Sequence, residues 1–267
     1  MSKQKISNND QEKILVIIGP TGSGKTGLAI EVARELSRLR GFDMEAGDFA
    51  AEVISADSRA IYKYMDIGTA KPTKEEMQGV PHWGIDLVEA NERFTVVDFC
   101  KYANNKIVQI QERGRLPIIA GGTGLYVDAL VYNYNFTTQA KETYADRQQM
   151  DSRYLVVGID WPREILRERL MQRANNFFTQ DIEGETKFLV EKYGWGSQAM
   201  KSNIYPIVWK MMNGEISHDE AIREFELDDW HLAKRQLTWF KRNKNIHWLK
   251  LSEAKDWIIN YYQNNND

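Results

Sequence analysis

A glycine-rich octapeptide near the start of the chain limits the possible folds more than any other feature. Residues 19–26 read Gly-Pro-Thr-Gly-Ser-Gly-Lys-Thr and follow the apolar run Ile-Leu-Val-Ile-Ile at 14–18. Apolar residues then recur at helical spacing over 25–39. This order of strand, glycine loop and helix is the context that the motif G-x-x-x-x-G-K-S/T requires. The sequence therefore predicts a phosphate-binding loop at the first turn of an α/β sheet.

Elementary chemistry explains why such a loop binds anions. Glycines let backbone N–H groups turn toward phosphate oxygens, and the positive end of the following helix faces the same point. Lys25 adds a mobile charge, and the Thr26 hydroxyl is a ligand for Mg²⁺. The residues predicted to bind the phosphate are Gly19, Thr21, Gly22, Ser23, Gly24, Lys25 and Thr26. The loop alone leaves open which phosphate compound it holds.

Strand and helix patterns alternate along the rest of the chain. Further strands are predicted at 52–55, 116–120, 154–159 and 247–249. Helices are predicted over 96–110, from 162 to 177, and over 183–193, 200–212, 218–226 and 229–243. Such alternation gives a parallel sheet. We predict an α/β protein with a P-loop parallel sheet flanked by helices and a helical C-terminal part.

Polar segments mark the ends of this unit and one internal connection. Residues 1–13 form a polar tail, and 14–250 form a single core with a short polar connection at 133–153. Residues 251–267 are expected to be a C-terminal helix with a frayed tail.

Composition narrows the class of protein. The net charge of −3 argues against a protein that coats nucleic acid by bulk charge, although local patches can still bind it. A single cysteine, Cys100, excludes an internal disulfide and fits a reducing compartment. No apolar run has the length of a signal peptide or a membrane span. We expect a cytoplasmic monomer with no membrane association.

Two further strand ends carry polar residues. Asp57 follows the strand at 52–55, and Thr123 follows the strand at 116–120 within a second glycine loop. The carboxyl ends of parallel strands meet at one edge of a sheet, so both residues can line one cleft with the first loop. Asp57 suits a water-mediated Mg²⁺ contact, a general base or a structural cap. The Thr123 hydroxyl suits a phosphate, a substrate or simply the turn.

Basic residues gather in two places. Arg163, Arg169 and Arg173 lie on the helix predicted from residue 162, where they can clamp a pyrophosphate or cover a solvated face. The segment 234–250 carries six basic residues and no acidic one, with aromatic residues interleaved. Such a segment can follow an RNA backbone, although its tryptophans suit a core equally well. The histidines show no metal-ligand spacing, and we predict no zinc site.

Six spaced motifs resemble those of the tRNA dimethylallyltransferases. They lie in the family's order at 19–26, 54–58, 62–72, 79–82, 121–126 and 232–239. The resemblance covers about 14–133 and 154–250.

This resemblance implies an activity and roles for the residues above. The family transfers a dimethylallyl group from its pyrophosphate to N6 of adenosine 37, beside the tRNA anticodon, with Mg²⁺. Asp57 matches its general base, Thr123 its hydroxyl in the second glycine loop, and Arg169 its pyrophosphate-binding arginine, with Arg163 and Arg173 nearby. The contacts to the target adenosine match Asp57, Ser58, Arg59, Ala60 and Thr123. The P-loop then holds a leaving pyrophosphate, and we expect no ATPase activity.

The chain also departs from the family pattern. Ala60 replaces a usual Gln, Arg59 a common apolar residue, Trp83 a His, and Asp229 with Trp230 a usual Thr-Arg pair. The family inserts a helical domain that grips the anticodon stem-loop where this chain has only 133–153.

The short connection resembles the adenylate isopentenyltransferases, which act on free AMP, ADP or ATP. The segment at 233–236 and the basic residues after it resemble the tRNA enzymes, and we favour a compact tRNA enzyme over the free-nucleotide alternative. A P-loop kinase is disfavoured because no Walker B carboxylate or Asn-Lys-x-Asp motif follows a strand. A non-catalytic relative is disfavoured because Lys25, Thr26, Asp57, Thr123 and Arg169 are all present.

Overall fold

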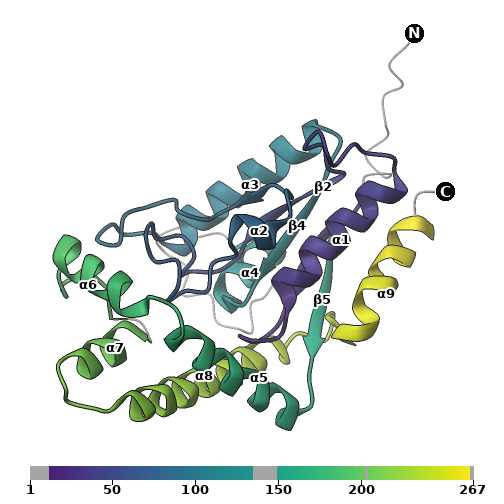
Figure 1. Cartoon of the computed structure of the whole chain (residues 1–267). Helices are drawn as coiled ribbons and strands as arrows, with labels where there is room; N and C mark the ends of the chain where they lie inside the picture. Colours follow the sequence, from purple (N-terminus) through teal and green to yellow (C-terminus); the bar gives the residue numbers. More distant parts are fainter. Residues whose placement is uncertain (1–11, 135–148, 202–203, 265–267) are drawn as a thin grey trace.

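A parallel sheet forms the centre of the computed structural model, which describes residues 12–134, 149–201 and 204–264. Within these ranges the sheet has six strands in the order β3-β2-β4-β1-β5-β6, and every pair is parallel (Figure 1). The strands are β1 Ile14–Ile18, β2 Ala51–Ser55, β3 His82–Trp83, β4 Leu116–Gly121, β5 Tyr154–Asp160 and β6 His247–Lys250. β1 lies between β4 and β5, so the loop that follows it leaves from the middle of the sheet.

Helices cover both faces of the sheet. They are α1 Lys25–Leu39, α2 Lys74–Met77, α3 Val96–Glu112, α4 Gly124–Val131, α5 Arg163–Phe178, α6 Ile182–Tyr193, α7 Ile204–Met212, α8 His218–Phe240 and α9 Leu251–Asn264. α1 and α9 pack on one face through residues such as Val32 and Ile258. α3 and α4 pack on the other, where the rings of Phe99 and Tyr126 stack 4.1 Å apart. The fold class predicted from the sequence is confirmed.

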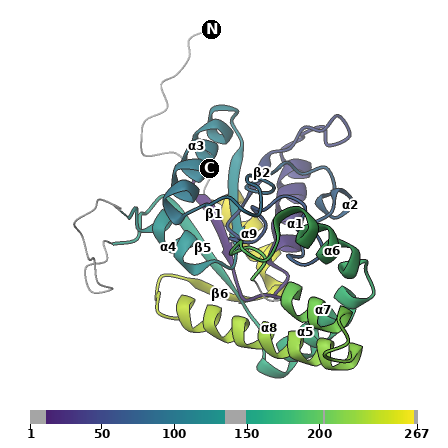
Figure 2. The same cartoon turned by 90° about the vertical axis from the view of Figure 1, so that its left-hand side faces the viewer.

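A separate helical layer lies beyond the carboxyl ends of the strands. α5 and α8 run side by side below the sheet, and α6 and α7 extend this layer (Figures 1 and 2). Its own apolar cluster includes Phe177, Leu189, Tyr205 and Phe225, and it takes in Met65 from the segment after β2. The helical layer therefore faces the sheet edge where the predicted site residues lie.

Two helix predictions differ from the structure. The sequence predicts separate helices over 218–226 and 229–243, but α8 is continuous from His218 to Phe240. Neither Gly nor Pro lies between the two predicted segments, so nothing interrupts the backbone hydrogen bonds. The predicted capping box of Ser217 and Glu220 is confirmed at its start. The two-residue strand β3 was not predicted because a run of two carries no periodicity.

Parts of the predicted segments lie outside the described residues. This applies to most of the tail at 1–13, to 135–148 within the connection, and to the last three residues. No helix in the described part of the chain is long and apolar enough to span a membrane.

Candidate active site

The glycine loop at 19–26 joins β1 to α1 and leaves the start of α1 open. Gly22 and Gly24 have φ values of 72° and 86°, which glycine adopts without steric cost. Gly24 is the N-cap of α1, so no side chain bonds to the first N–H groups, and the first turn holds no acidic residue. These N–H groups and the positive helix end make the loop suitable for binding an anion.

Lys25 is held beside this loop, half-buried, with its Nζ 3.4 Å from the carbonyl oxygen of Pro20. Burial lowers the pKa of Lys25 because the charged form loses solvation. The negative charges of Asp57 and Asp229 oppose this lowering of the pKa, and the positive charge of Arg173 adds to it. An anion bound in the loop would stabilise the charged ammonium form of Lys25 and raise its pKa again.

The ends of β2 and β4 meet through hydrogen bonds between their loops. The Ser58 amide donates to Thr123 Oγ1 at 2.9 Å, and the Thr123 hydroxyl donates to Ser58 Oγ at 3.2 Å. Gly121 permits this approach, because a Cβ there would lie 2.2 Å from the Ala56 carbonyl oxygen. Asp57 accepts a bond from the Arg59 amide at 2.8 Å through Oδ1. The sequence correctly predicted that these strand ends share one edge.

Two of the three predicted arginines of α5 reach the glycine loop. Arg169 donates from Nε to the Gly22 carbonyl oxygen at 2.8 Å. Arg173 donates to Thr21 Oγ1 at 2.6 Å and forms an ion pair with the buried carboxylate of Asp229. Arg163 lies elsewhere: it is exposed and sits over the ring of Trp230, 5.3 Å from its centroid. The anion site therefore gains two guanidinium groups from α5.

The structure adds two residues on α8 for which the sequence suggested no role. Gln236 accepts from the Thr21 amide at 2.7 Å and donates to the Gly122 carbonyl oxygen at 3.0 Å, so it joins the two glycine loops. Asp229 orients Arg173, and burial raises the pKa of Asp229 despite this partner. Gln236 lies 215 residues from Thr21, so periodicity and spacing give no sign of the contact.

One cavity of about 390 Å³ brings most of the predicted residues together. Its walls include Thr21, Gly22, Gly24, Lys25, Thr26, Asp57, Ser58, Arg59, Ala60, Thr123 and Arg173. The segment after β2 returns to line it with Gly68, Thr69, Ala70 and Pro72, and α8 adds Phe225, Leu232, Arg235 and Gln236. Ser23 is fully buried and packs against Gly19, so these two residues shape the loop from behind.

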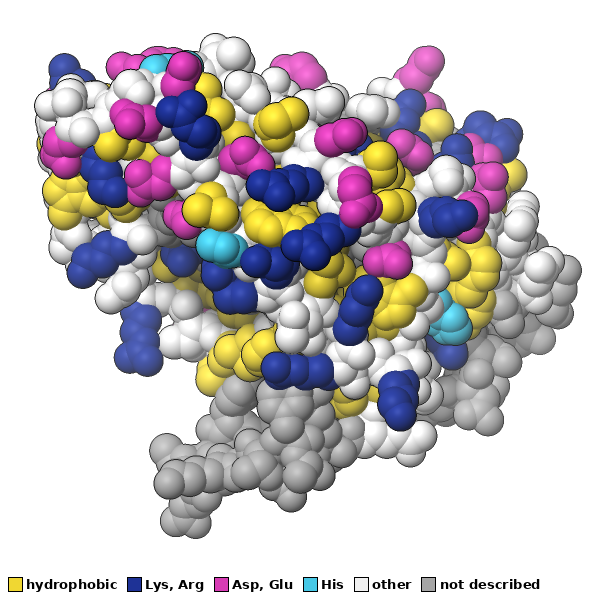
Figure 3. All heavy atoms as spheres, turned by 90° about the horizontal axis from the view of Figure 1, so that it is seen from below, with side chains coloured by type: hydrophobic (Ala, Val, Ile, Leu, Met, Phe, Trp, Pro, Cys, Tyr) yellow, Lys and Arg dark blue, Asp and Glu magenta, His cyan; other side chains and the backbone are white. Residues whose placement is uncertain are grey.

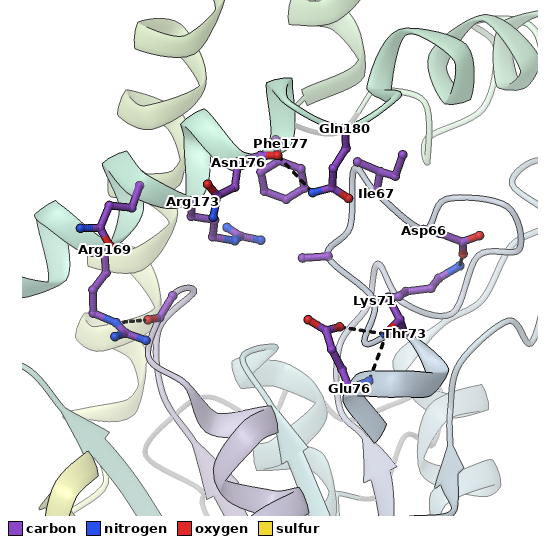
Figure 4. Close-up of a pocket in the computed structure, with 13 residues that line it drawn as sticks. Asp66, Ile67, Lys71, Thr73, Glu76, Arg169, Arg173, Asn176, Phe177 and Gln180 are labelled. Atoms are coloured by element: carbon purple, nitrogen blue, oxygen red, sulfur yellow. Dashed lines mark hydrogen bonds and ion pairs between the residues drawn. The ribbon is translucent and has the colours of Figure 1, made fainter. Parts of the chain in front are cut away.

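A second cavity, of about 340 Å³, adjoins the first (Figure 4). Gly22, Ala70 and Arg173 line both cavities. Figure 4 shows Arg169 and Arg173 on α5 facing Lys71, Thr73 and Glu76 across this space. The anion loop is therefore open on two sides.

Metal binding at this site would depend on oxygen atoms. The described residues contain no group of three or more His, Cys, Asp or Glu side chains placed to hold a metal ion. The Thr26 hydroxyl and the Asp57 carboxylate line the same cavity, beside the loop that suits a phosphate. Oxygen ligands of this kind, completed by phosphate oxygens and water, suit Mg²⁺ better than zinc.

The basic segment at 234–250 is divided between core and surface. Trp239 donates from Nε1 to Asp128 at 3.0 Å and packs against Gly124, and Phe240 is buried, so both belong to the core. Lys234, Arg235, Lys241 and Arg242 are exposed. Figure 3 shows the face seen from below, where Lys and Arg side chains gather near the middle.

Comparisons with known proteins identify the family of this chain. The family model described as IPP transferase matches residues 60–152 and 137–243. A tRNA dimethylallyltransferase of Acetivibrio thermocellus is 34% identical, and the alignment covers 91% of this chain and 93% of the relative. The chain belongs to the tRNA dimethylallyltransferase family. It is therefore a transferase, as the resemblance in its motifs implied.

Solved structures of the family share the fold over nearly the whole chain. A tRNA isopentenylpyrophosphate transferase of Bacillus halodurans has a TM-score of 0.81 and 28% identity, covering 96% of this chain and 97% of that one. One from Staphylococcus epidermidis has a TM-score of 0.79 and 30% identity, covering 95% and 100%. A eukaryotic dimethylallyltransferase acting on tRNA, at 20% identity and a TM-score of 0.74, shares the fold.

The family model matches this chain in two segments. The two matches to the family model meet and overlap at 137–152. The alignment with the Acetivibrio protein runs over 303 residues, more than the 267 of this chain, so the relative has residues without a counterpart here. The overlap of the two matches falls within 133–153, where we expect the family's insertion to be missing.

Proposed function

We propose that this family member transfers a dimethylallyl group from dimethylallyl pyrophosphate to N6 of adenosine 37 in tRNA, forming N6-isopentenyladenosine. The observation that carries the proposal is the cavity shared by the anion loop, Asp57 and Thr123. A pyrophosphate in the loop and an adenine beside Asp57 would meet inside it. The names of the relatives favour tRNA over a free adenine nucleotide as the acceptor.

In the proposed reaction, the C1–O bond of the donor breaks and a bond from N6 to C1 forms. Positive charge develops on the allylic carbon, and negative charge develops on the departing pyrophosphate. The loop N–H groups, Lys25, Arg169 and Arg173 would stabilise that negative charge where it forms. The reaction requires no hydrolysis of a nucleotide such as ATP, so the P-loop would bind the leaving pyrophosphate instead.

Asp57 is proposed as the general base. The exocyclic amine of adenine attacks only if its proton has an acceptor, and Asp57 would take that proton as the new bond forms. One carboxylate oxygen, Oδ1, already accepts from the Arg59 amide, which fixes the orientation of the group. General-base catalysis of this kind contributes about 10²–10⁴-fold. Thr123, held by Ser58, would hold the adenine with Ser58, Arg59 and Ala60.

Mg²⁺ is proposed as the cofactor, with Thr26 as its ligand. A cation there would neutralise charge on the departing pyrophosphate. The two arginines of α5, which bond to Gly22 and Thr21 of the loop, would neutralise charge on the same group without a metal.

The acceptor would approach along a basic stripe, which we define as Lys234, Arg235, Lys241 and Arg242. These exposed residues lie on and just beyond the second half of α8, and Arg235 also lines the cavity. The stripe therefore leads from the surface to the site. Lys and Arg side chains in such an arrangement bind phosphates without reading bases.

The test is transfer of label from dimethylallyl pyrophosphate with Mg²⁺, with unmodified tRNA and AMP offered in parallel. Label in tRNA alone supports the proposal. Label in AMP alone would replace it with a free-nucleotide enzyme, and label in neither would indicate a relative without activity.

A further inference from the structure

One acidic side chain of the helical layer holds the segment that walls the site. Glu185, in the first turns of α6, accepts from three successive backbone N–H groups. Oε2 accepts from Asp66 at 2.9 Å and from Ile67 at 2.7 Å, and Oε1 accepts from Gly68 at 2.8 Å. Three converging N–H groups form a nest of the kind that binds anions, and here a carboxylate of the same chain fills it.

A buried tyrosine completes this contact. The Tyr205 hydroxyl donates to Glu185 Oε1 at 2.8 Å, so each carboxylate oxygen accepts two bonds. Burial and the neighbouring carboxylate raise the pKa of Tyr205, which keeps its hydroxyl protonated. The Tyr205 ring also packs on Gly68, where an added Cβ would lie 2.5 Å from Cζ. Glu185 and Tyr205 together fix the position of Gly68.

The first turns of α6, which carry Glu185, are capped and packed against the helical layer. Asp181 caps the helix by accepting from the Gly184 amide at 3.0 Å. Ile182 and Leu189 are buried in the cluster of the helical layer. Glu185 therefore projects from a packed element onto a segment that has no regular structure of its own at 66–72.

The segment held in this way separates the two cavities. Gly68, Thr69 and Ala70 line the cavity that contains Lys25 and Asp57. Asp66, Ile67 and Ala70 line the adjoining one. With a pyrophosphate in the loop, the hydrocarbon of the donor would enter a cavity that Gly68, Thr69 and Ala70 line. The position of this segment would then determine the orientation of the reacting carbon and the length of hydrocarbon chain that the cavity accepts.

We propose that Glu185 is a positioning residue that fixes residues 66–70, the wall between the two cavities. By holding this wall in place, Glu185 aligns the dimethylallyl group and limits the donor to a short chain. This inference rests on the proposed transfer. Glu185 itself lines neither cavity. Without the Glu185 carboxylate, the wall would shift toward the second cavity. A donor with a ten-carbon chain would then fit where the wild-type wall excludes it.

The experiment compares wild type with Glu185→Ala, Glu185→Gln and Tyr205→Phe, using tRNA as acceptor and either dimethylallyl or geranyl pyrophosphate as donor. For Glu185→Ala we expect kcat with the short donor to fall about 10–100-fold because the reacting carbon is misaligned. The KM for that donor should change by less than about threefold, since the anion loop is intact. The geranyl-to-dimethylallyl ratio of kcat/KM should rise about tenfold or more.

The other variants should change the donor ratio by smaller amounts. Glu185→Gln keeps the size and one acceptor oxygen, so its ratio should fall between those of wild type and Glu185→Ala. Tyr205→Phe keeps the ring against Gly68 and removes one bond to Glu185, and it should shift the ratio in the same direction by less. Glu191→Ala is the matched control, an exposed glutamate on the same helix, and should behave as wild type.

A purely structural role predicts a different pattern. Thermal unfolding of each variant reports the folded fraction at the assay temperature. A lower kcat with an unchanged donor ratio would overturn the inference, and so would an unchanged kcat. If Glu185→Ala does not fold, the ratios of Glu185→Gln and Tyr205→Phe decide the question. Wild type that transfers neither donor to tRNA would instead refute the proposed function.

Discussion

Replacing Gln236 tests whether the two glycine loops act as one unit. Gln236→Leu keeps approximate size but removes the bond from the Thr21 amide and the bond to the Gly122 carbonyl. Both of these residues are buried, so two backbone groups lose their partners. An unsatisfied buried group costs about 1–3 kcal/mol, so two such groups lower the free energy of unfolding by about 2–6 kcal/mol.

Two assays measure the consequences. Urea unfolding should show a midpoint lower by about 1–2 M, since the slope for unfolding is about 3 kcal/mol per M for a chain of this size. Titration with dimethylallyl pyrophosphate should show about tenfold weaker binding, because the Thr21 part of the loop is no longer held. Gln263→Leu, at an exposed glutamine of α9, is the matched control. A variant with the urea midpoint and donor affinity of wild type would refute the role of Gln236.

Three further predictions concern the site directly. Asp57→Ala should bind the donor with nearly the affinity of wild type and lose transfer by about 10²-fold or more, and unchanged turnover would remove Asp57 from the mechanism. Lys25→Met should bind the donor more weakly. In wild type, the lowered pKa of Lys25 should rise when the anion binds, so calorimetry at alkaline pH should detect proton uptake that Lys25→Met lacks; equal proton uptake in both would contradict this. Binding of tRNA should weaken steeply with salt, and less steeply when Lys241 and Arg242 of the basic stripe are replaced by Gln; equal slopes would exclude the stripe as a tRNA-binding surface.

The sequence predicted the parts of the site that lie in continuous motifs. The phosphate loop depends on eight consecutive residues between a strand and a helix, so its position followed from local pattern. Asp57 and Thr123 followed from a general property of parallel sheets, which place the carboxyl ends of strands at one edge. The structure brings both residues to the loop, as expected.

Contacts between distant segments could not be predicted in this way. Gln236 and Glu185 contact backbone groups more than a hundred residues away, and backbone partners leave no trace in residue type. Arg163 matches the arginine pattern of α5 but points to Trp230, because helical rotation separates it from Arg169 and Arg173. Side-chain chemistry identified the candidates, and helix packing decided which of them reach the site.

One departure from the family pattern has a structural explanation. Trp83, where the family has a His, donates from Nε1 to the buried carboxylate of Glu52 at 2.7 Å. Arg113 and Arg115 also bind this carboxylate, and these contacts hold its pKa below the usual range despite burial. Glu52 lies on β2 and Trp83 on β3, while the two arginines lie between α3 and β4. None of the four lines the two cavities beside the loop. Trp83 therefore belongs to the scaffold that supports the sheet and does not line the candidate site.

The most direct test of the central claim is the position of the transferred group. Wild-type protein is incubated with labelled dimethylallyl pyrophosphate, Mg²⁺ and one of two tRNAs, which carry either adenosine or guanosine at position 37. We predict label only in the tRNA with adenosine, recovered as N6-isopentenyladenosine after digestion. Label in both tRNAs, or in AMP but in neither tRNA, would contradict the account.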